Sequence, residues 1–134
     1  LACEIGIVSS KEIDKINILQ ASILSMHKAI EKITLRFELI LVDGPHFKKY
    51  KNFNHKCIIR GDSKYQAIAA ASIIAKTYRD KLMMKMHVDY PQYKWCRNKG
   101  YPTPEHRQAI INFGITNHHR KSFKLINNQT TLNI

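Results

Sequence analysis

The chain has 134 residues, the length of one domain and enough to bury about two-thirds of its unfolded surface. It holds 44% hydrophobic residues, five Gly and four Pro, and no low-complexity tract, a composition that favours a folded globular protein over a disordered or fibrous one. No apolar run approaches the roughly 20 residues of a membrane-spanning helix, and residues 1–10 lack the features of a signal peptide. We therefore expect a cytoplasmic protein with no membrane partner. Three widely spaced cysteines predict reduced thiols.

The charge of the chain points to a polyanionic partner. Twenty-two Lys and Arg against ten Asp and Glu give a formal net charge of +12. The surplus rises after residue 94 and ends in a basic cluster, which comprises His118, His119, Arg120, Lys121 and Lys124. The alternative is a generally basic protein with solvated charges, and charge alone does not choose between the two.

The first elements follow from hydrophobic periodicity and capping signals. Residues 2–8 alternate small and apolar side chains and predict a strand. Ser9, with Glu12 three positions later, predicts a capping box at the start of a short helix. A second helical stretch follows, with one buried stripe at Leu19, Ile23, Met26, Ile30 and Ile33.

Two further strands are predicted in the middle of the chain. Residues 38–42 form an aliphatic run that is typical of a parallel strand buried on both faces, and 56–60 form the next strand. The loop between them, residues 46–55, leaves little room for a crossover helix. That connection stays open at this point.

The second half of the chain is predicted to be helical. Residues 63–87 form the longest helix, and the alanine-rich half of its apolar stripe predicts a very close neighbour. Thr103, Pro104 and Glu105 carry the signals of a helix start, and Gly114 those of its end. Strands that alternate with helices predict an α/β domain with a small sheet.

Two acids follow directly on the two central strands. Asp43 and Asp62 should both emerge at the carboxyl edge of the sheet, where α/β proteins bind ligands. Two neighbouring carboxylates there could share hard divalent cations such as Mg²⁺. The alternative is structural: Asp43 begins a turn and Asp62 caps the long helix.

Six motifs in order along the chain carry a resemblance to a known family. They are LILVDG (39–44), GDSK (61–64), AAASIIAK with RD (69–80), YPQY (90–93), KGYPT (99–103) and HHRKSF (118–123). Together they closely resemble ribonuclease HII and leave only the loop around 47–54 and the last ten or so residues unmatched.

The resemblance implies an enzyme of the ribonuclease H fold, and it implies roles for particular residues. It would hydrolyse the RNA strand of RNA/DNA hybrids and cut at ribonucleotides within duplex DNA. In this family four carboxylates hold two Mg²⁺ or Mn²⁺ ions, and the products carry 5′-phosphate and 3′-hydroxyl ends. Asp43 and Asp62 resemble the third and fourth carboxylates, as catalytic residues and metal ligands. Tyr101 resembles the tyrosine that packs on the sugar at the RNA to DNA junction; the alternative is a tyrosine of the core. We expect the full-length protein to be a monomer.

Further residues are expected to bind the substrate. Lys64 opens the long helix beside Asp62, where a phosphate could meet the lysine and the helix amides. The loop and the basic cluster add Lys99, His119, Arg120, Lys121 and Ser122. The histidines of the cluster could instead bind a metal, but phosphate contacts explain the cluster better. We interpret Trp95 as a packing residue.

The chain also departs from the family pattern. The Asp-Glu pair and the Gly-Arg-Gly of the family's opening strand occur nowhere in the 134 residues, and residues 2–8 resemble the family's third strand. We therefore expect residues 1–134 to be the C-terminal two-thirds of one ribonuclease H-like catalytic domain. It would hold the third to fifth strands, flanking helices and the C-terminal helical region, without the central first strand. Such a chain should be inactive alone, and the alternative function is a basic, non-catalytic nucleic-acid-binding module.

Overall fold

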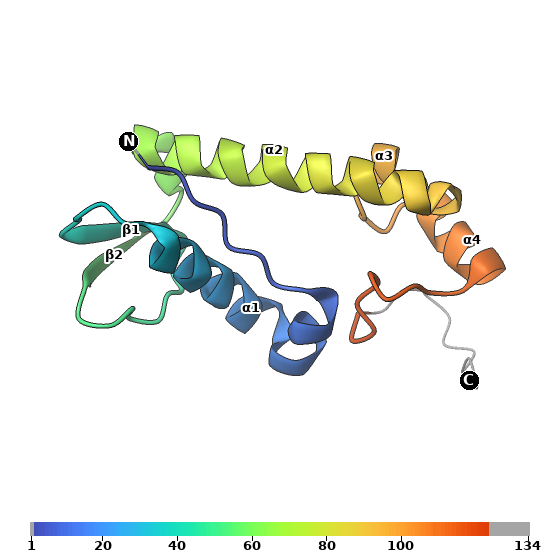
Figure 1. Ribbon diagram of the computed structural model, residues 1–134, viewed down its shortest axis with the longest axis horizontal. Helices are drawn as coiled ribbons and strands as arrows, with labels where there is room; N and C mark the ends of the chain where they lie inside the picture. The colour runs from blue at the N-terminus through green and yellow to red at the C-terminus, as the bar shows by residue number, and fades with distance from the viewer. Residues whose placement is uncertain (1, 124–134) are drawn as a thin grey trace. The chain divides into compact units, whose positions relative to one another are not determined.

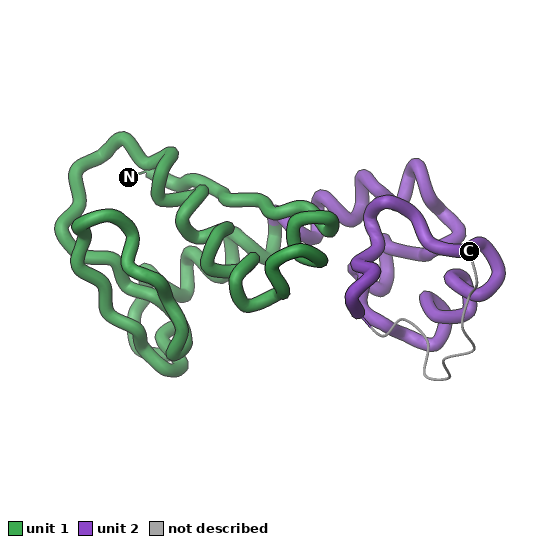
Figure 2. Tube along the Cα trace, turned by 90° about the horizontal axis from the view of Figure 1, so that it is seen from below, with its two compact units in different colours: residues 1–77 green, residues 78–134 purple. Residues whose placement is uncertain are grey.

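The computed structural model describes residues 2–123 and shows the expected mixed α/β chain (Figure 1). In chain order the elements are α1 (Ser10–Lys32), β1 (Leu39–Asp43), β2 (Asn54–Ile58), η1 (Gly61–Ser63), α2 (Gln66–Asp89), η2 (Pro91–Tyr93), α3 (Trp95–Asn98) and α4 (Pro104–Phe113). The chain divides into two compact units, residues 1–77 and 78–134 (Figure 2). The boundary falls inside α2, so the first half of this helix belongs to one unit and the second half to the other.

Helix α1 begins at the predicted capping box. The Ser9 hydroxyl accepts from the Glu12 N–H at 3.2 Å, and the Glu12 carboxylate accepts from the Ser9 N–H at 2.9 Å. Asn17 has φ +66° and ψ 168°, which breaks α1 into the short first helix and the longer second one that the sequence predicts. Of the predicted stripe only Ile23 is buried among the described residues, and Leu19 is exposed. The stripe therefore describes the packing of α1 only in part.

The strand predicted at residues 2–8 is wrong. This segment joins no sheet; instead it runs along α1, where Lys28 and Lys32 donate to the carbonyl oxygens of Ile7 and Ile5. Gly6 permits this close approach, because a Cβ there would overlap the carbonyl of Ser25. A strand needs a ladder partner, and the alternation of side chains does not show whether the chain supplies one.

The other two strands are confirmed, and they pair in parallel. The register sets Leu39 opposite Asn54 and Asp43 opposite Ile58. The loop between them contains no helix, as its length predicts, and it is anchored by Tyr50, which is buried. The expected burial of the first strand on both faces is wrong: within the described residues only Val42 of β1 is buried. Within the described residues the sheet has two strands, with Val42, Ile58 and neighbouring apolar side chains as its core.

Helix α2 begins and ends two or three residues later than predicted. Its Ile68 is buried in the first unit, but residues 70–79 are all exposed. The close neighbour expected for the alanine-rich half is therefore not present among the residues described. In the second unit α2 buries Met83, whereas Leu82 of the predicted stripe is exposed. The stripe correctly predicted a helix but not which of its side chains are covered.

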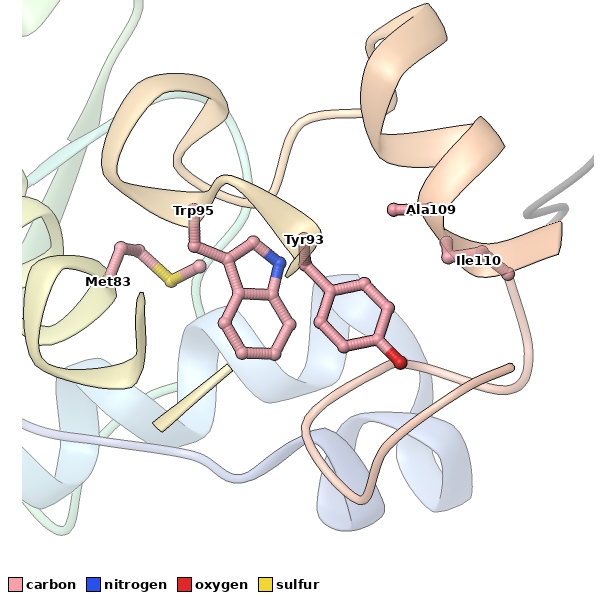
Figure 3. Close-up of a cluster of buried hydrophobic side chains, with 5 residues drawn as sticks. All are labelled: Met83, Tyr93, Trp95, Ala109 and Ile110. Carbon is pink, nitrogen blue, oxygen red and sulfur yellow. The ribbon is translucent and has the colours of Figure 1, made fainter. Parts of the chain in front are cut away.

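The second unit has an aromatic core (Figure 3). Trp95 and Tyr93 are the two largest fully buried side chains, with ring planes 20° apart and centroids separated by 5.1 Å. The Trp95 indole lies between Met83 of α2 and the Tyr93 ring, and Ala109 and Ile110 of α4 complete the cluster. The Tyr93 hydroxyl donates to the carbonyl of Gly114 at 2.9 Å, beyond the end of α4. The interpretation of Trp95 as a packing residue is confirmed.

Helix α4 has the predicted boundaries. The Thr103 hydroxyl accepts from the His106 N–H at 3.3 Å, Pro104 is the first residue of the helix, and Gly114 ends it with φ +74°. The three cysteines are free thiols, as predicted. Among residues 2–123 no helix is long and apolar enough to cross a membrane.

Candidate functional site

The carboxyl edge of the sheet carries both acids that the sequence singles out. Asp43 is the last residue of β1, and Asp62 lies in η1, four positions after the end of β2. Because the strands are parallel, both acids follow strand ends at the same edge. Asp43 Oδ1 accepts a 2.8 Å hydrogen bond from the Gly61 N–H, which ties the end of β1 to η1. Asp43 Oδ2 has no partner within residues 2–123.

Asp62 does not cap the long helix. Its side chain is exposed, and its Oδ1 accepts from the adjacent Ser63 N–H at 2.9 Å, while α2 begins only at Gln66. The structural alternative for Asp62 is therefore wrong. The alternative for Asp43 is correct in part, since Gly44 follows it in a turn with φ +86°.

Asp43 and Asp62 are suitable ligands for a hard cation, but two ligands are too few to form a complete metal site. Exposed carboxylate oxygens at a ligand-binding edge are the donors that Mg²⁺ and Mn²⁺ prefer. Across the part of the chain that the structure describes, no three or more acids, histidines or cysteines are arranged so that they could hold a metal ion. The donor chemistry fits a divalent metal, and the number of ligands does not complete a site.

Lys64 lies just before α2, at the same end of the first unit. Its side chain is exposed, and its Nζ donates to the carbonyl of Ile59 at 3.0 Å. This bond holds the ammonium group near the backbone that links β2 to η1. A phosphate contact by Lys64 stays a prediction.

In the second unit the turn that carries Tyr101 is tightly built. Lys99 and Gly100 both have positive φ, and the Tyr101 N–H donates to the Asn98 carbonyl at 2.8 Å. The Tyr101 side chain is 63% exposed, so it is not a core residue. The Arg79 guanidinium carbon lies 5.3 Å from the centroid of the Tyr101 ring, within range of a cation–π contact. The turn thus presents an aromatic face beside positive charge, and Lys99 is half-buried in it.

The predicted basic cluster is only partly a surface. Lys121 and Ser122 are exposed, and the Arg120 guanidinium carbon lies 3.8 Å from the centroid of the Phe123 ring. Lys124 lies outside the described residues. The cluster therefore offers one arginine, held over an aromatic ring, and one exposed lysine.

His119 has to be removed from the predicted phosphate contacts. It is 7% exposed, and both of its ring nitrogens are within hydrogen-bonding distance of protein groups, Thr116 on one side and His106 on the other. Burial, followed by the neighbouring imidazoles of His106 and His118, lowers the pKa of His119 from 6.5 to about 4. A neutral, buried imidazole does not attract phosphate.

His106 is a residue that the sequence analysis missed. It is 4% exposed, and burial lowers its pKa below 6.5. It occupies the third position of α4, directly after Pro104 and Glu105, where the sequence signals describe only a helix start. Nothing in the sequence pairs it with His119, thirteen residues further on.

A mixed α/β chain with two acids at the carboxyl edge of parallel strands belongs to a broad class whose members bind ligands at that edge, and this chain also carries a net charge of +12. Comparison with known proteins narrows this class. The family model described as ribonuclease HII matches residues 2–126. The chain belongs to the ribonuclease HII family, which confirms the resemblance seen in the sequence.

Individual relatives agree with the family model. The chain is 57% identical over 122 residues to ribonuclease HII of Christiangramia forsetii, covering 91% of this chain and 62% of the relative. It is 54% identical over 132 residues to ribonuclease HII of Parabacteroides distasonis, and the match covers 98% of this chain and 66% of the relative. It is 48% identical over 121 residues to ribonuclease HII of Trichodesmium erythraeum, and the match covers 90% of this chain and 57% of the relative. The chain thus spans less than two-thirds of the length of these relatives.

Proposed function

We propose that this chain supplies part of the catalytic domain of a metal-dependent endonuclease. The enzyme would hydrolyse the RNA strand of RNA/DNA hybrids and cut at ribonucleotides in duplex DNA, in the cytoplasm and as a monomer. The observation that carries the proposal is the ribonuclease HII match over residues 2–126. The two acids at one sheet edge support it independently.

Asp43 and Asp62 are the proposed metal ligands. Two bound Mg²⁺ or Mn²⁺ ions would activate water and stabilise the leaving 3′-oxygen, giving 5′-phosphate and 3′-hydroxyl ends. Asp43 is oriented by the Gly61 N–H through one oxygen, which leaves Oδ2 for a ligand. Asp62 lies on a short helical turn whose backbone fixes its Oδ1.

The basic and aromatic residues are the proposed substrate contacts. Lys64, Lys99, Arg120 and Lys121 would neutralise phosphates, and Ser122 would donate to one. Tyr101, exposed and rigidly held, would pack on a sugar or base at the junction. In this assignment the first unit provides carboxylates and one lysine, and the second provides most contacts to the nucleic acid.

The 134-residue chain by itself should not cleave. Two carboxylates inside a chain of charge +12 give too little negative charge to gather two cations. The chain should nevertheless bind duplex nucleic acid. The alternative function is therefore a basic, non-catalytic binding module, which the net charge of +12 favours.

A complementation assay tests the proposal. The chain is mixed with the part of the Parabacteroides distasonis ribonuclease HII that it does not match, and cleavage of a duplex with a single ribonucleotide is followed with Mg²⁺. We expect cleavage only in the mixture, abolished by Asp43→Asn or Asp62→Asn. Tyr101→Ala should slow the cut far more than it lowers the melting temperature.

Two results would contradict the proposal. Robust cleavage by the chain alone that Asp43→Asn removes would show that two carboxylates suffice. Binding without cleavage in every mixture, including one in which the two parts are shown to associate, would favour the binding module.

A further inference from the structure

The second unit contains a polar network inside its aromatic core. Asn98, His106 and His119 are 7%, 4% and 7% exposed, and they are the buried polar side chains of residues 2–123. They come from the end of α3, the first turn of α4 and the segment after α4. A buried polar group costs free energy unless it has a hydrogen-bond partner, so we expect each of these three side chains to be hydrogen-bonded.

The protons of the network can be placed from one end. Asn98 Nδ2 donates to the Tyr93 carbonyl at 2.7 Å, so Asn98 Oδ1 is the acceptor that faces the other way. It accepts from the Gly100 N–H at 2.9 Å and lies 3.2 Å from His106 Nδ1. His106 therefore carries its proton on Nδ1, which leaves Nε2 as an acceptor in the neutral ring.

The hydrogen bonds of His119, at the other end of the network, lead to the same placement of the protons. The Thr116 N–H donates to His119 Nδ1 at 3.0 Å, so that nitrogen carries no proton. The Thr116 hydroxyl lies 3.0 Å from the same nitrogen and donates to it, while the hydroxyl oxygen accepts from the His118 N–H. The proton of neutral His119 is then on Nε2, which lies 3.2 Å from His106 Nε2 and donates to it. One neutral tautomer of each ring satisfies all of these hydrogen bonds at once.

Protonation of either ring breaks this order. A second proton on His119 would set Nδ1–H against the Thr116 N–H and would force the Thr116 hydroxyl to change from donor to acceptor. A second proton on His106 would set two N–H groups against each other across the 3.2 Å contact. The titratable neighbours offer no compensation. The Tyr93 hydroxyl is engaged with Gly114, His118 is another cation when charged, and Glu105 pairs with Lys94 on the surface.

A shared zinc ion is the other arrangement that sets two imidazole nitrogens so close. Two ligands at 2.0–2.1 Å around tetrahedral zinc lie about 3.4 Å apart. That arrangement needs the Nδ1 atoms to carry the protons, because a neutral ligating ring is protonated on its other nitrogen. His119 Nδ1 instead accepts a backbone N–H, and no third ligand lies close among the described residues. The geometry points to a direct N–H···N bond.

The network joins the two segments that the proposed function uses. At one end Asn98 holds Gly100, whose φ is +78°, and through its carbonyl the N–H of Tyr101. At the other end Thr116 and His119 close the turn that leads directly into Arg120. The two imidazoles form a direct polar connection between these segments, in addition to the aromatic core that packs beside them.

We propose that Asn98, His106, His119 and Thr116 form a histidine network that positions the Tyr101 turn and the Arg120 segment for nucleic acid while both imidazoles are neutral. The lowered pKa values of both rings agree with this order. The four are positioning residues, which act through Tyr101 and Arg120. The consequence for substrate rests on the proposed function, whereas the network itself does not.

The first test reads the protons without any nucleic acid. Long-range ¹H–¹⁵N spectra of the full chain at pH 7 should show His106 as the Nδ1–H tautomer and His119 as the Nε2–H tautomer. Addition of Zn²⁺ should leave both unchanged. The opposite tautomer on either ring, or zinc bound by both, would overturn the network.

The second test uses amide exchange at the two ends. His106→Phe keeps an aromatic ring but removes both central bonds, and the Gly100 and Thr116 amides should then exchange about tenfold faster. His119→Gln keeps an N–H toward His106 and should retain most of the protection. His118→Gln is the matched control, an adjacent imidazole outside the network. Equal protection in all variants would overturn the positioning role.

The third test separates the network from the function. The wild-type chain should bind a short RNA/DNA hybrid, and the His106→Phe variant should bind it several-fold more weakly. The separate His119→Gln variant should keep most of the wild-type affinity. Unchanged affinity in His106→Phe would overturn the proposed positioning. If the wild type itself fails to bind the hybrid, the proposed function fails, while the tautomers and the exchange data still decide the network.

Discussion

The two units of this chain treat their polar side chains in opposite ways. In the first unit the proposed functional groups Asp43 and Asp62 are exposed and make few bonds to protein. In the second unit Asn98, His106 and His119 are buried and fully bonded. The first arrangement leaves oxygen atoms to be used by an added ligand, whereas the second fixes loops without one. We therefore expect added ions to organise the sheet edge, whereas buried packing and hydrogen bonds within the protein organise the aromatic unit.

The largest effect should come from the core of the second unit. Trp95→Ala removes a side chain that is 2% exposed and stacked on Tyr93, and should lower the free energy of unfolding by about 3–5 kcal/mol. Tyr101→Ala is the matched control, an exposed aromatic residue whose loss should change stability by at most about 0.5 kcal/mol. Urea denaturation of both variants measures the difference. Similar losses would mean that Tyr101 belongs to the core.

Local signals in the sequence predicted elements whose causes are themselves local. The Ser9 to Glu12 capping box, the two strands and the Thr103 to Gly114 helix depend on bonds within a few residues or on one apolar run. The strand at residues 2–8 failed because pairing depends on a partner elsewhere in the chain. The stripe on α2 failed because periodicity shows which residues share a face but not what covers that face.

The site divides along the same line. The acids at the strand ends could be predicted, since parallel strands bring their carboxyl ends to one edge. The network of His106 and His119 could not, because it needs two segments to close on each other around Trp95. For that reason the sequence predicts His119 at the surface with its basic neighbours, whereas the structure buries it. A run of basic residues in the sequence shows the charge of that segment. Whether one of its side chains is buried depends instead on how the whole unit packs.

The next prediction tests whether the sheet edge is organised by ions. Asp43→Asn should weaken Mg²⁺ binding by about tenfold or more, because charge count controls the affinity of hard cations. The Asn side chain can still accept from the Gly61 N–H, so stability should change little. Chemical shift changes of the Gly61 amide during a Mg²⁺ titration report the binding.

The control for that titration lies at the other end of the same strand. Glu38→Gln removes one negative charge just before β1 begins and should leave Mg²⁺ binding unchanged. Equal losses in the two variants would show that Mg²⁺ responds to net charge and that the carboxyl edge holds no site.

A smaller effect should separate the units in nucleic-acid binding. Lys121→Ala should lower the dependence of log affinity on log salt by about one unit if this lysine contacts a phosphate. Lys49, exposed on the loop between β1 and β2 of the first unit, is the matched control, and Lys49→Ala should leave the slope unchanged. Binding of a hybrid duplex at several salt concentrations gives the slopes. An equal change in both variants would place phosphate contacts on both units.

The smallest effects should appear on acidification, in two separate pH windows. In the first unit the Ser9 N–H, followed by Lys28, lowers the pKa of Glu12 from 4.5 to about 2. The folded carboxylate is therefore favoured above pH 4.5, and its contribution is lost as the pH falls from 4.5 through about 2. In the second unit burial lowers the pKa of His119 from 6.5 to about 4, so the neutral network is favoured above pH 6.5 and is lost between 6.5 and about 4.

One probe for each unit resolves these windows. Trp95 is the single tryptophan of the chain, and its ring centroid lies 5.4 Å from that of His119, so its fluorescence reports the second unit. The Glu12 carboxyl carbon, followed by NMR, reports the first. His119→Gln should remove the fluorescence change between pH 6.5 and 4 and leave the Glu12 titration in place, because the two groups belong to different units. Glu12→Gln should have the converse effect. A single transition shared by both probes would show that the units respond to acid as one, and that the contrast between an exposed, ligand-dependent edge and a self-sufficient core does not extend to their stability.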